Sequence, residues 1–152
     1  MERWAIRKRL RQMQRVLVDS RCALEKASEM VRNKWMKDLL FMMSCRRLIM
    51  LNLLDRELGT FGVVNKPGPE AERHFDHYVV DPLNNSSSRP TDSFVNACEQ
   101  EESYLKTELN ELMVQPGLAG RTRQMILNLL NEAEENLNDL RFVKVNVPGL
   151  RA

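Results

Sequence analysis

The stretch EAERHFDHYVVD, residues 70–81, contains both histidines of this 152-residue chain. In a helix, Glu70, His74, His77 and Asp81 would lie along one stripe, because they follow one another at steps of four, three and four residues. Glu70, His74 and His77 have the chemistry to bind zinc and leave one coordination position open. The same stripe would also suit a proton relay or a solvated helix face.

The element that must position this stripe is a short helix, predicted from about Pro69 to Val80. Its apolar side, which includes Phe75 and Val79, lies roughly perpendicular to the stripe, so the stripe borders the core without pointing into it. The two histidines are three residues apart, whereas ligand pairs on a helix commonly stand four apart. The pattern therefore favours a solvated face, with metal binding and a contact with a partner as the alternatives.

Composition predicts one helical domain. The chain is 43% hydrophobic and 29% charged, and its length suits a single core. Six glycines and six prolines are too few for a β-barrel with many turns, and the abundance of Leu, Met, Glu and Arg favours helix. Three widely spaced cysteines without a CxxC motif predict an intracellular, reducing compartment.

Hydrophobic periodicity predicts four long helices, at about residues 2–32, 35–58, 91–114 and 119–143. The first exceeds the usual length, so a break or a long overhang is expected near residues 18–20. Gly59 is expected to cap the second helix. The predicted fold is all-α, with four long antiparallel helices and a crossover at 59–90 that carries the short helix. The domain would span 1–144, followed by a tail at 145–152.

Charge is unevenly distributed along the chain. Residues 1–47 carry 13 basic and 5 acidic residues, a net charge of +8, whereas the remainder carries 10 and 16, a net charge of −6. The amphipathic, arginine-rich beginning is similar to a mitochondrial presequence, which makes a mitochondrial location an alternative. Asp38, Arg46 and Arg47 interrupt the apolar second helix, so no membrane span is predicted.

Two groups of residues are predicted to contact a partner. The second helix is apolar over most of its circumference, so either it is the central helix of the bundle or a second molecule covers its extra ridge, Phe41, Cys45, Leu48 and Ile49. The first helix carries a basic side that would suit a polar or acidic partner, consisting of Arg7, Lys8, Arg11 and Arg15.

No motif for catalysis is present: there is no GxSxG, no glycine-rich phosphate loop and no cysteine in an electropositive motif. The tandem acids Glu101–Glu102 and Glu134–Glu135 are expected to be solvated helix faces. The sequence thus predicts no enzymatic activity, no cofactor and no small-molecule substrate.

Three segments carry a resemblance to a known family: LDRELG at 54–59, CEQEESYLKTELNEL at 98–112 and LLNEAEENLNDLR at 129–141. From about residue 23 to 144 the chain resembles bacterial ferritin-like bundles of the domain-of-unknown-function type. Ferritin-like carboxylate proteins hold two metals with a Glu on two helices and an ExxH on each of the other two. This chain offers Glu25 or Glu29 and Glu99 or Glu102, but it contains no ExxH. The resemblance therefore implies the fold without the di-metal ligands.

These observations favour a non-catalytic scaffold, an accessory subunit that binds other protein subunits. One alternative is a metal-binding ferritin-like protein or oxidoreductase. The other is a ribonucleoprotein subunit, which is disfavoured because no nucleic-acid-binding motif accompanies the basic residues.

Overall fold

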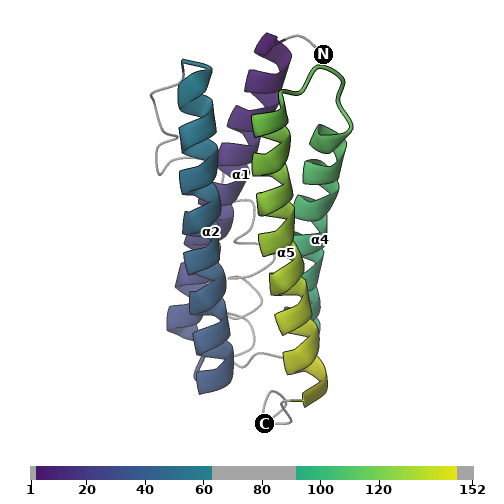
Figure 1. Ribbon diagram of the computed structural model, residues 1–152. Coiled ribbons are helices and arrows are strands. Elements are labelled where there is room, and N and C mark those ends of the chain that lie inside the picture. The colour runs from purple at the N-terminus through teal and green to yellow at the C-terminus, as the bar shows by residue number, and fades with distance from the viewer. Residues whose placement is uncertain (1–2, 63–91, 147–152) are drawn as a thin grey trace.

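The computed structural model describes residues 3–62 and 92–146, which form four long α-helices joined in pairs by short connections (Figure 1). No strand occurs in these two ranges, so the predicted all-α fold with four long helices is confirmed. The short helix predicted near residues 69–80 lies outside the described residues. The helices are α1 (Arg3–Met30), α2 (Lys34–Thr60), α4 (Asp92–Met113) and α5 (Gly120–Asn146).

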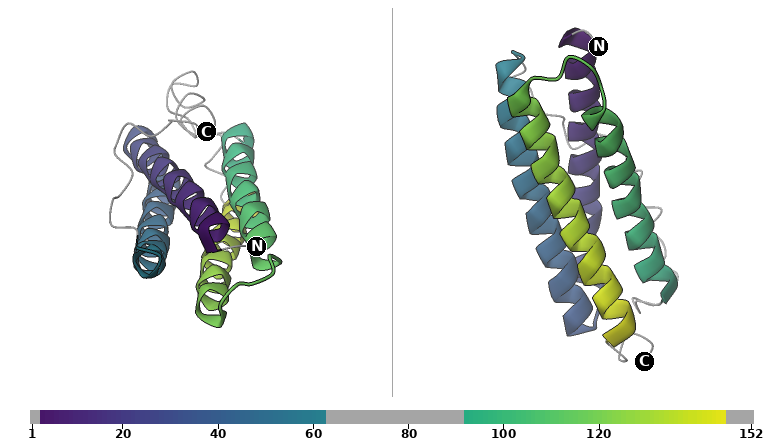
Figure 2. Two further views of the ribbon diagram at one scale, coloured as in Figure 1. Left: turned by 90° about the horizontal axis from the view of Figure 1, so that it is seen from above. Right: turned by 45° about the vertical axis from the view of Figure 1, so that its right-hand side comes forward.

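The helices run lengthwise beside one another with alternating directions. α1 and α5 run one way, and α2 and α4 run the other way (Figures 1 and 2). α2 lies against both α1 and α5, and α4 lies against α5. Side chains also join α1 to α4, for example Arg9 to Glu111 at 3.4 Å. α2 thus has neighbours on one side of its circumference among the described helices, which leaves its other side facing outward.

α1 is a single continuous helix, so the break predicted near residues 18–20 does not occur. Its 28 residues span about 40 Å. The helix contains no glycine or proline, and its apolar side chains stay buried along its length, including Leu10, Leu17 and Leu24. Asp19 and Ser20, at the position of the predicted break, are buried polar side chains within the helix. Tertiary contacts therefore stabilise a helix longer than the average.

The ends of α2 are set by local chemistry. At its start, Asn33 has an extended backbone, and its side-chain oxygen accepts a hydrogen bond from the Met36 amide at 3.0 Å. At its end, the helix continues past Gly59 to Thr60, and Gly62 has a φ of 81°. Glycine adopts this left-handed conformation without a steric penalty. The predicted cap at Gly59 is therefore wrong, because the cap is Phe61, two residues later.

Replacing Asn33 with alanine should lower the free energy of unfolding by about 1 kcal/mol, because one backbone N–H at the start of α2 loses its acceptor. Urea unfolding followed by circular dichroism would measure the change. Asn33→Asp keeps an acceptor at this position and should retain most of the stability. Equal unfolding curves for the alanine variant and the wild type would contradict the capping role.

The core consists of two apolar clusters along the axis of the bundle. One cluster lies toward the α1–α2 connection and includes Leu24, Met36 and Leu140. The other lies toward the α4–α5 connection and includes Leu10, Leu54 and Leu129. Buried polar side chains from all four helices lie between the two clusters, and on α5 they are accompanied by the buried Ala133 and Leu137. This polar layer is the most unusual feature of the interior.

None of the described helices, α2 included, is both long enough and apolar enough to cross a bilayer. The prediction of no membrane span agrees with this finding for residues 3–62 and 92–146.

Candidate functional site

A group of buried polar side chains, here called the ionic layer, crosses the middle of the bundle. Every helix contributes to it, and all its members are almost completely buried. Arg47 is 0% exposed and Glu101 is 3% exposed. The layer consists of Ser20 from α1, Arg47 from α2, Glu101 and Glu102 from α4, and Asn136 from α5.

Arg47 is the centre of the ionic layer. Its Nη2 atom forms an ion pair with Glu102 Oε1 and lies 3.7 Å from Glu101 Oε1. Its Nε atom donates a hydrogen bond to Ser20 Oγ at 2.8 Å, and Ser20 Oγ in turn donates to Glu101 Oε1. A charge-assisted pair that is also supported by further hydrogen bonds is the arrangement in which buried ions are best compensated.

Asn136 connects the ionic layer to the surface. Its Nδ2 atom donates a hydrogen bond to Glu102 Oε1 at 3.3 Å, and its Oδ1 atom accepts one from Arg46 at 2.7 Å. The Arg46 guanidinium also pairs with Asp139 on α5 at 2.7 Å. A continuous chain of polar contacts therefore runs from the buried Glu102 to the α2–α5 surface.

The charges within the layer do not cancel when every group is ionised, because two glutamates share one arginine. Burial raises the pKa of Glu101 to about 7, although the Arg47 guanidinium opposes the shift. The negative charges of Glu102 and Asp19 raise the pKa of Glu101 further. Burial also raises the pKa of Glu102, and Arg47 again opposes this effect. Glu101 thus titrates close to neutral pH.

Cys98 lies one helical turn before the two glutamates on α4 and is fully buried. Burial, together with the negative charges of Glu101 and Glu102, raises the pKa of its thiol well above the ordinary value of 9.0. Only the thiolate is an effective nucleophile or metal ligand. The environment of Cys98 therefore disfavours reactivity, and its side chain serves as part of the apolar core.

The ionic layer does not fit a di-metal centre of the ferritin-like kind. It contains two carboxylates and no histidine, and the Arg47 guanidinium pairs with the carboxylate oxygen that a metal would need. Across residues 3–62 and 92–146, no three His, Cys, Asp or Glu side chains come together as metal ligands. An arginine thus provides the positive charge that balances the interior carboxylates.

Sequence reasoning missed the ionic layer. Glu101 and Glu102 were expected on a solvated face, and this prediction is wrong, because both are buried. The apolar stripe of α4 could have predicted this burial. The two glutamates lie midway between the buried Cys98 and Leu105, where an apolar residue would continue the stripe. Arg47 likewise falls between the buried Met43 and Met50 on α2.

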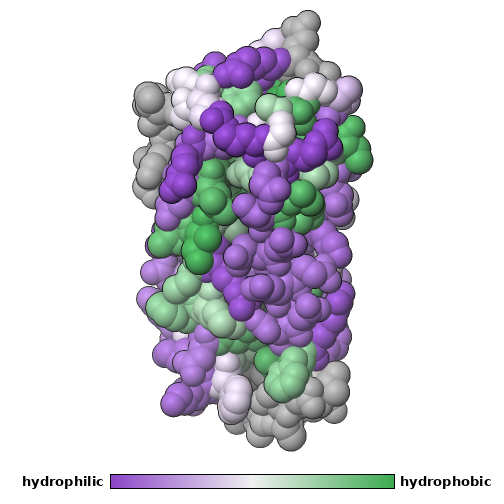
Figure 3. Space-filling model, viewed as in Figure 1, coloured by the Kyte–Doolittle hydropathy of each residue, from purple (hydrophilic) through white to green (hydrophobic). Residues whose placement is uncertain are grey.

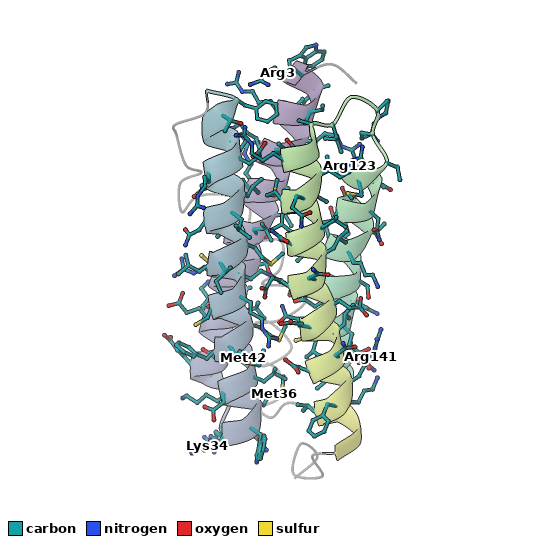
Figure 4. The ribbon with its side chains drawn as sticks, in the orientation of Figure 1. Arg3, Lys34, Met36, Met42, Arg123 and Arg141 are labelled. Atoms are coloured by element: carbon teal, nitrogen blue, oxygen red, sulfur yellow. The ribbon has the colours of Figure 1, made fainter. Side chains whose placement is uncertain are left out.

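The ridge predicted on the second helix lies on the outside of the bundle. Phe41 is 59% exposed and Leu48 is 41% exposed, and Cys45 and Ile49 are also exposed. The alternative in which this ridge is buried within the bundle is therefore wrong. Met42, labelled in Figure 4, adds a further exposed side chain. We name this surface the α2 outer face, composed of Phe41, Met42, Cys45, Leu48 and Ile49.

Figure 3 shows hydrophobic residues gathered along α2, on the left of the molecule, between hydrophilic ones. The Cys45 thiol is exposed at this surface, because this side of α2 has no neighbouring helix among those described.

The basic residues predicted to meet a partner lie on α1. Arg7, Lys8 and Arg15 are exposed, and Arg11 is half-buried. The predicted stripe of Glu70, His74 and His77 lies outside the described residues.

A cavity of about 150 Å³ lies at the end of the bundle where α5 begins. Arg3, at the start of α1 in Figure 4, lies beside it, and its guanidinium stacks 4.3 Å above the Phe61 ring. The buried Glu57 carboxylate in its wall accepts a hydrogen bond from Thr122 at 2.6 Å and pairs with Arg121 at 3.2 Å. Glu57 on α2 is thus paired with two residues of α5, and these contacts hold the ends of the two helices together.

No protein-family model, curated protein or solved structure matches this chain. Its classification therefore rests on the fold and on the ionic layer. The described residues define a four-helix bundle with an ionic layer at its centre and an apolar strip on the outside of α2.

Proposed function

We propose that this chain is a non-catalytic interaction protein that serves as an accessory subunit of a larger protein assembly. The observation that carries the proposal is the α2 outer face, where five apolar side chains form one strip on the outside of the bundle. The largest contiguous apolar patch on a protein surface is often a contact site. The scaffold is a ferritin-like bundle in which the ionic layer takes the place of the metal centre.

The ionic layer supports this proposal because it suits a structural role. It joins all four helices through Arg47, and sliding one helix along another would separate a buried carboxylate from its partner. A buried charge without compensation costs several kcal/mol, so the layer favours one relative height of the helices. The α2 outer face is thereby presented on a fixed frame, which reduces the entropic cost of binding.

The basic residues of α1 suit a second contact on the same partner. α1 lies directly beside α2, so a partner on the α2 outer face that extends around the bundle would meet Arg7, Lys8 and Arg15. Exposed charges of one sign increase the rate of association with an acidic surface more than they increase affinity. We expect this contact to weaken with salt while the apolar contact persists.

Affinity purification of the full chain from its source cells tests the proposal. We expect other protein subunits to co-purify with the wild type and to be lost with Leu48→Lys, because the charge interrupts the α2 outer face. Leu127→Lys is the matched control, since Leu127 is 39% exposed, close to the 41% of Leu48, but lies on α5. Quantitative mass spectrometry would compare the three purifications.

Two results would overturn the proposed function. One is a wild-type purification that contains no subunit above the background of an unrelated bait. The other is an equal loss of subunits with both variants, since this would mean that the α2 outer face has no special role. Circular dichroism of both variants would verify that they keep the helical fold.

A further inference from the structure

The α2 outer face has the pattern of a helix-pairing seam. Phe41, Cys45 and Leu48 follow one another at steps of four and three residues, and Met42 and Ile49 are seven residues apart beside them. Side chains at these spacings lie along one side of a helix and interdigitate with a second helix that carries the same pattern. The seam lies in the middle of α2, so the strip has polar residues at both ends.

The charges at the two ends of the seam are opposite. Asp38 lies toward the start of α2 and Arg56 toward its end, and both are exposed. They are 18 residues apart, which is five helical turns, so they lie on one side of the helix. That side is the side of the seam, because Asp38 comes four residues before Met42 and Arg56 comes seven residues after Ile49. The point halfway between them along the helix axis lies at the height of Cys45 and Ile49, in the exposed seam.

We propose that the α2 outer face binds a second copy of this chain, with the two α2 helices antiparallel about a two-fold axis close to Cys45 and Ile49. A two-fold contact brings the same surface of each copy together, so Asp38 of each copy meets Arg56 of the other. Two opposite-charge pairs then flank the apolar centre. A parallel pairing would place Asp38 against Asp38 and Arg56 against Arg56, which is unfavourable.

The size of the seam indicates a moderate affinity. Five exposed apolar side chains on a helix of 27 residues form a patch of a few hundred Å². This is the centre of a small interface, below the roughly 800 Å² per partner of a typical stable complex, unless the flanking polar residues join the contact. We therefore expect a reversible monomer–dimer equilibrium that depends on protein concentration.

Charge exchange at the two ends of the seam tests the two-fold pairing. Asp38→Arg and Arg56→Asp should each weaken the dimer roughly ten- to thirtyfold, because each turns two attractive pairs into repulsive ones. An equimolar mixture of the two single variants should form a dimer again, since each Arg then faces an Asp. The double variant should also regain dimerisation. Sedimentation equilibrium of the purified full chain would measure each dissociation constant.

Two further measurements locate the contact. Ile49→Glu should abolish the dimer, whereas Leu127→Glu on α5, an exposed leucine away from the seam, should leave it unchanged. In the wild type, alkylation of the exposed Cys45 thiol should slow as the protein concentration rises, because the dimer covers it. Circular dichroism would verify that each variant remains helical.

The inference rests on the proposed function, because it names the partner of the same surface, but the two can fail separately. A wild-type chain that stays monomeric at every concentration, or a mixture of the charge variants that does not recover the dimer, overturns the pairing of two copies. The proposed function would still stand if affinity purification retained a different subunit that Leu48→Lys removes. Both fail if the chain is monomeric and no subunit co-purifies.

Discussion

Replacing Arg47 with methionine should lower the free energy of unfolding by about 3–5 kcal/mol, the largest effect expected from a single substitution in this protein. Methionine keeps an unbranched apolar stem but ends short of the guanidinium, so the space left behind adds to the loss. The effect arises because Glu101 and Glu102 stay buried while the cation that compensates them is removed. Ser20 also loses the donor at 2.8 Å that orients its hydroxyl toward Glu101.

Urea unfolding of the wild type and Arg47→Met would measure this loss, with Arg46→Met as the matched control. Arg46 is the adjacent arginine and pairs with Asp139, but its side chain is 18% exposed, so water replaces part of what it loses. We expect the control to cost roughly 1 kcal/mol. A loss for Arg47→Met no greater than that for Arg46→Met would contradict the central role of Arg47.

A combined variant keeps this prediction testable even if Arg47→Met does not fold. Arg47→Met together with Glu101→Gln and Glu102→Gln removes the cation and both negative charges. Because no buried charge then lacks compensation, most of the stability should return. Failure of the triple variant to recover would show that Arg47 contributes through its shape and hydrogen bonds more than through its charge.

The second large effect is a decline in stability as pH rises from about 4.5 to about 7. In the folded protein the pKa of Glu101 is about 7, whereas in the unfolded chain it returns to the ordinary value of 4.5. Between these values the folded state holds a proton that the unfolded state has released, so raising the pH favours unfolding. The stabilisation is complete below the unfolded pKa and is lost as pH rises through the folded pKa. The pKa difference corresponds to roughly 3 kcal/mol.

Glu101→Gln isolates this effect because glutamine is neutral at every pH and can still accept a hydrogen bond from Ser20. The variant should gain stability relative to the wild type as pH rises, from little difference near pH 4.5 to roughly 3 kcal/mol above pH 7. The raised pKa of Glu102 gives a decline of the same sign in both proteins. The informative quantity is therefore the difference between the two curves.

Glu134→Gln is the control for the pH measurement. The hydrogen bond from Lys106 at 2.6 Å lowers the pKa of Glu134, so its contribution has the opposite sign and is lost as pH falls. We expect no gain in stability for this variant at high pH. If the free energies of unfolding of the wild type and Glu101→Gln change in parallel between pH 4.5 and 8, Glu101 does not have the raised pKa on which the prediction depends.

Most of the fold follows from local information in the sequence. The apolar period and the positions of proline and glycine predict four helices, and each described boundary lies within a few residues of its prediction. Pro116 and Gly117, for example, follow the end of α4, where Gly117 adopts a φ of 85°. The break expected in α1 was wrong because the long helix is supported by contacts with other helices, which a single helix does not encode.

The candidate site could be predicted only in part, for a physical reason. Two adjacent glutamates on a helix have the same local sequence pattern whether their charges are solvated by water or paired with an arginine. Which of these occurs depends on the helices that surround them. Glu102 meets Arg47 across 55 residues of sequence and Asn136 across 34. The ionic layer therefore exists only once four helices stand at matching heights.

The sequence by itself determined that α2 has two apolar sides, because the spacing of Phe41, Cys45 and Leu48 is separate from that of Met43 and Met50. Only the tertiary structure decided which side is covered. α1 and α5 pack against the side that carries Met43, Arg47 and Met50, and the other side faces outward as the α2 outer face. The physical reason is that the hydrophobic effect favours the burial of both apolar sides of α2 without specifying a partner for either. The positions of the neighbouring helices determine which of the two sides is buried within the bundle.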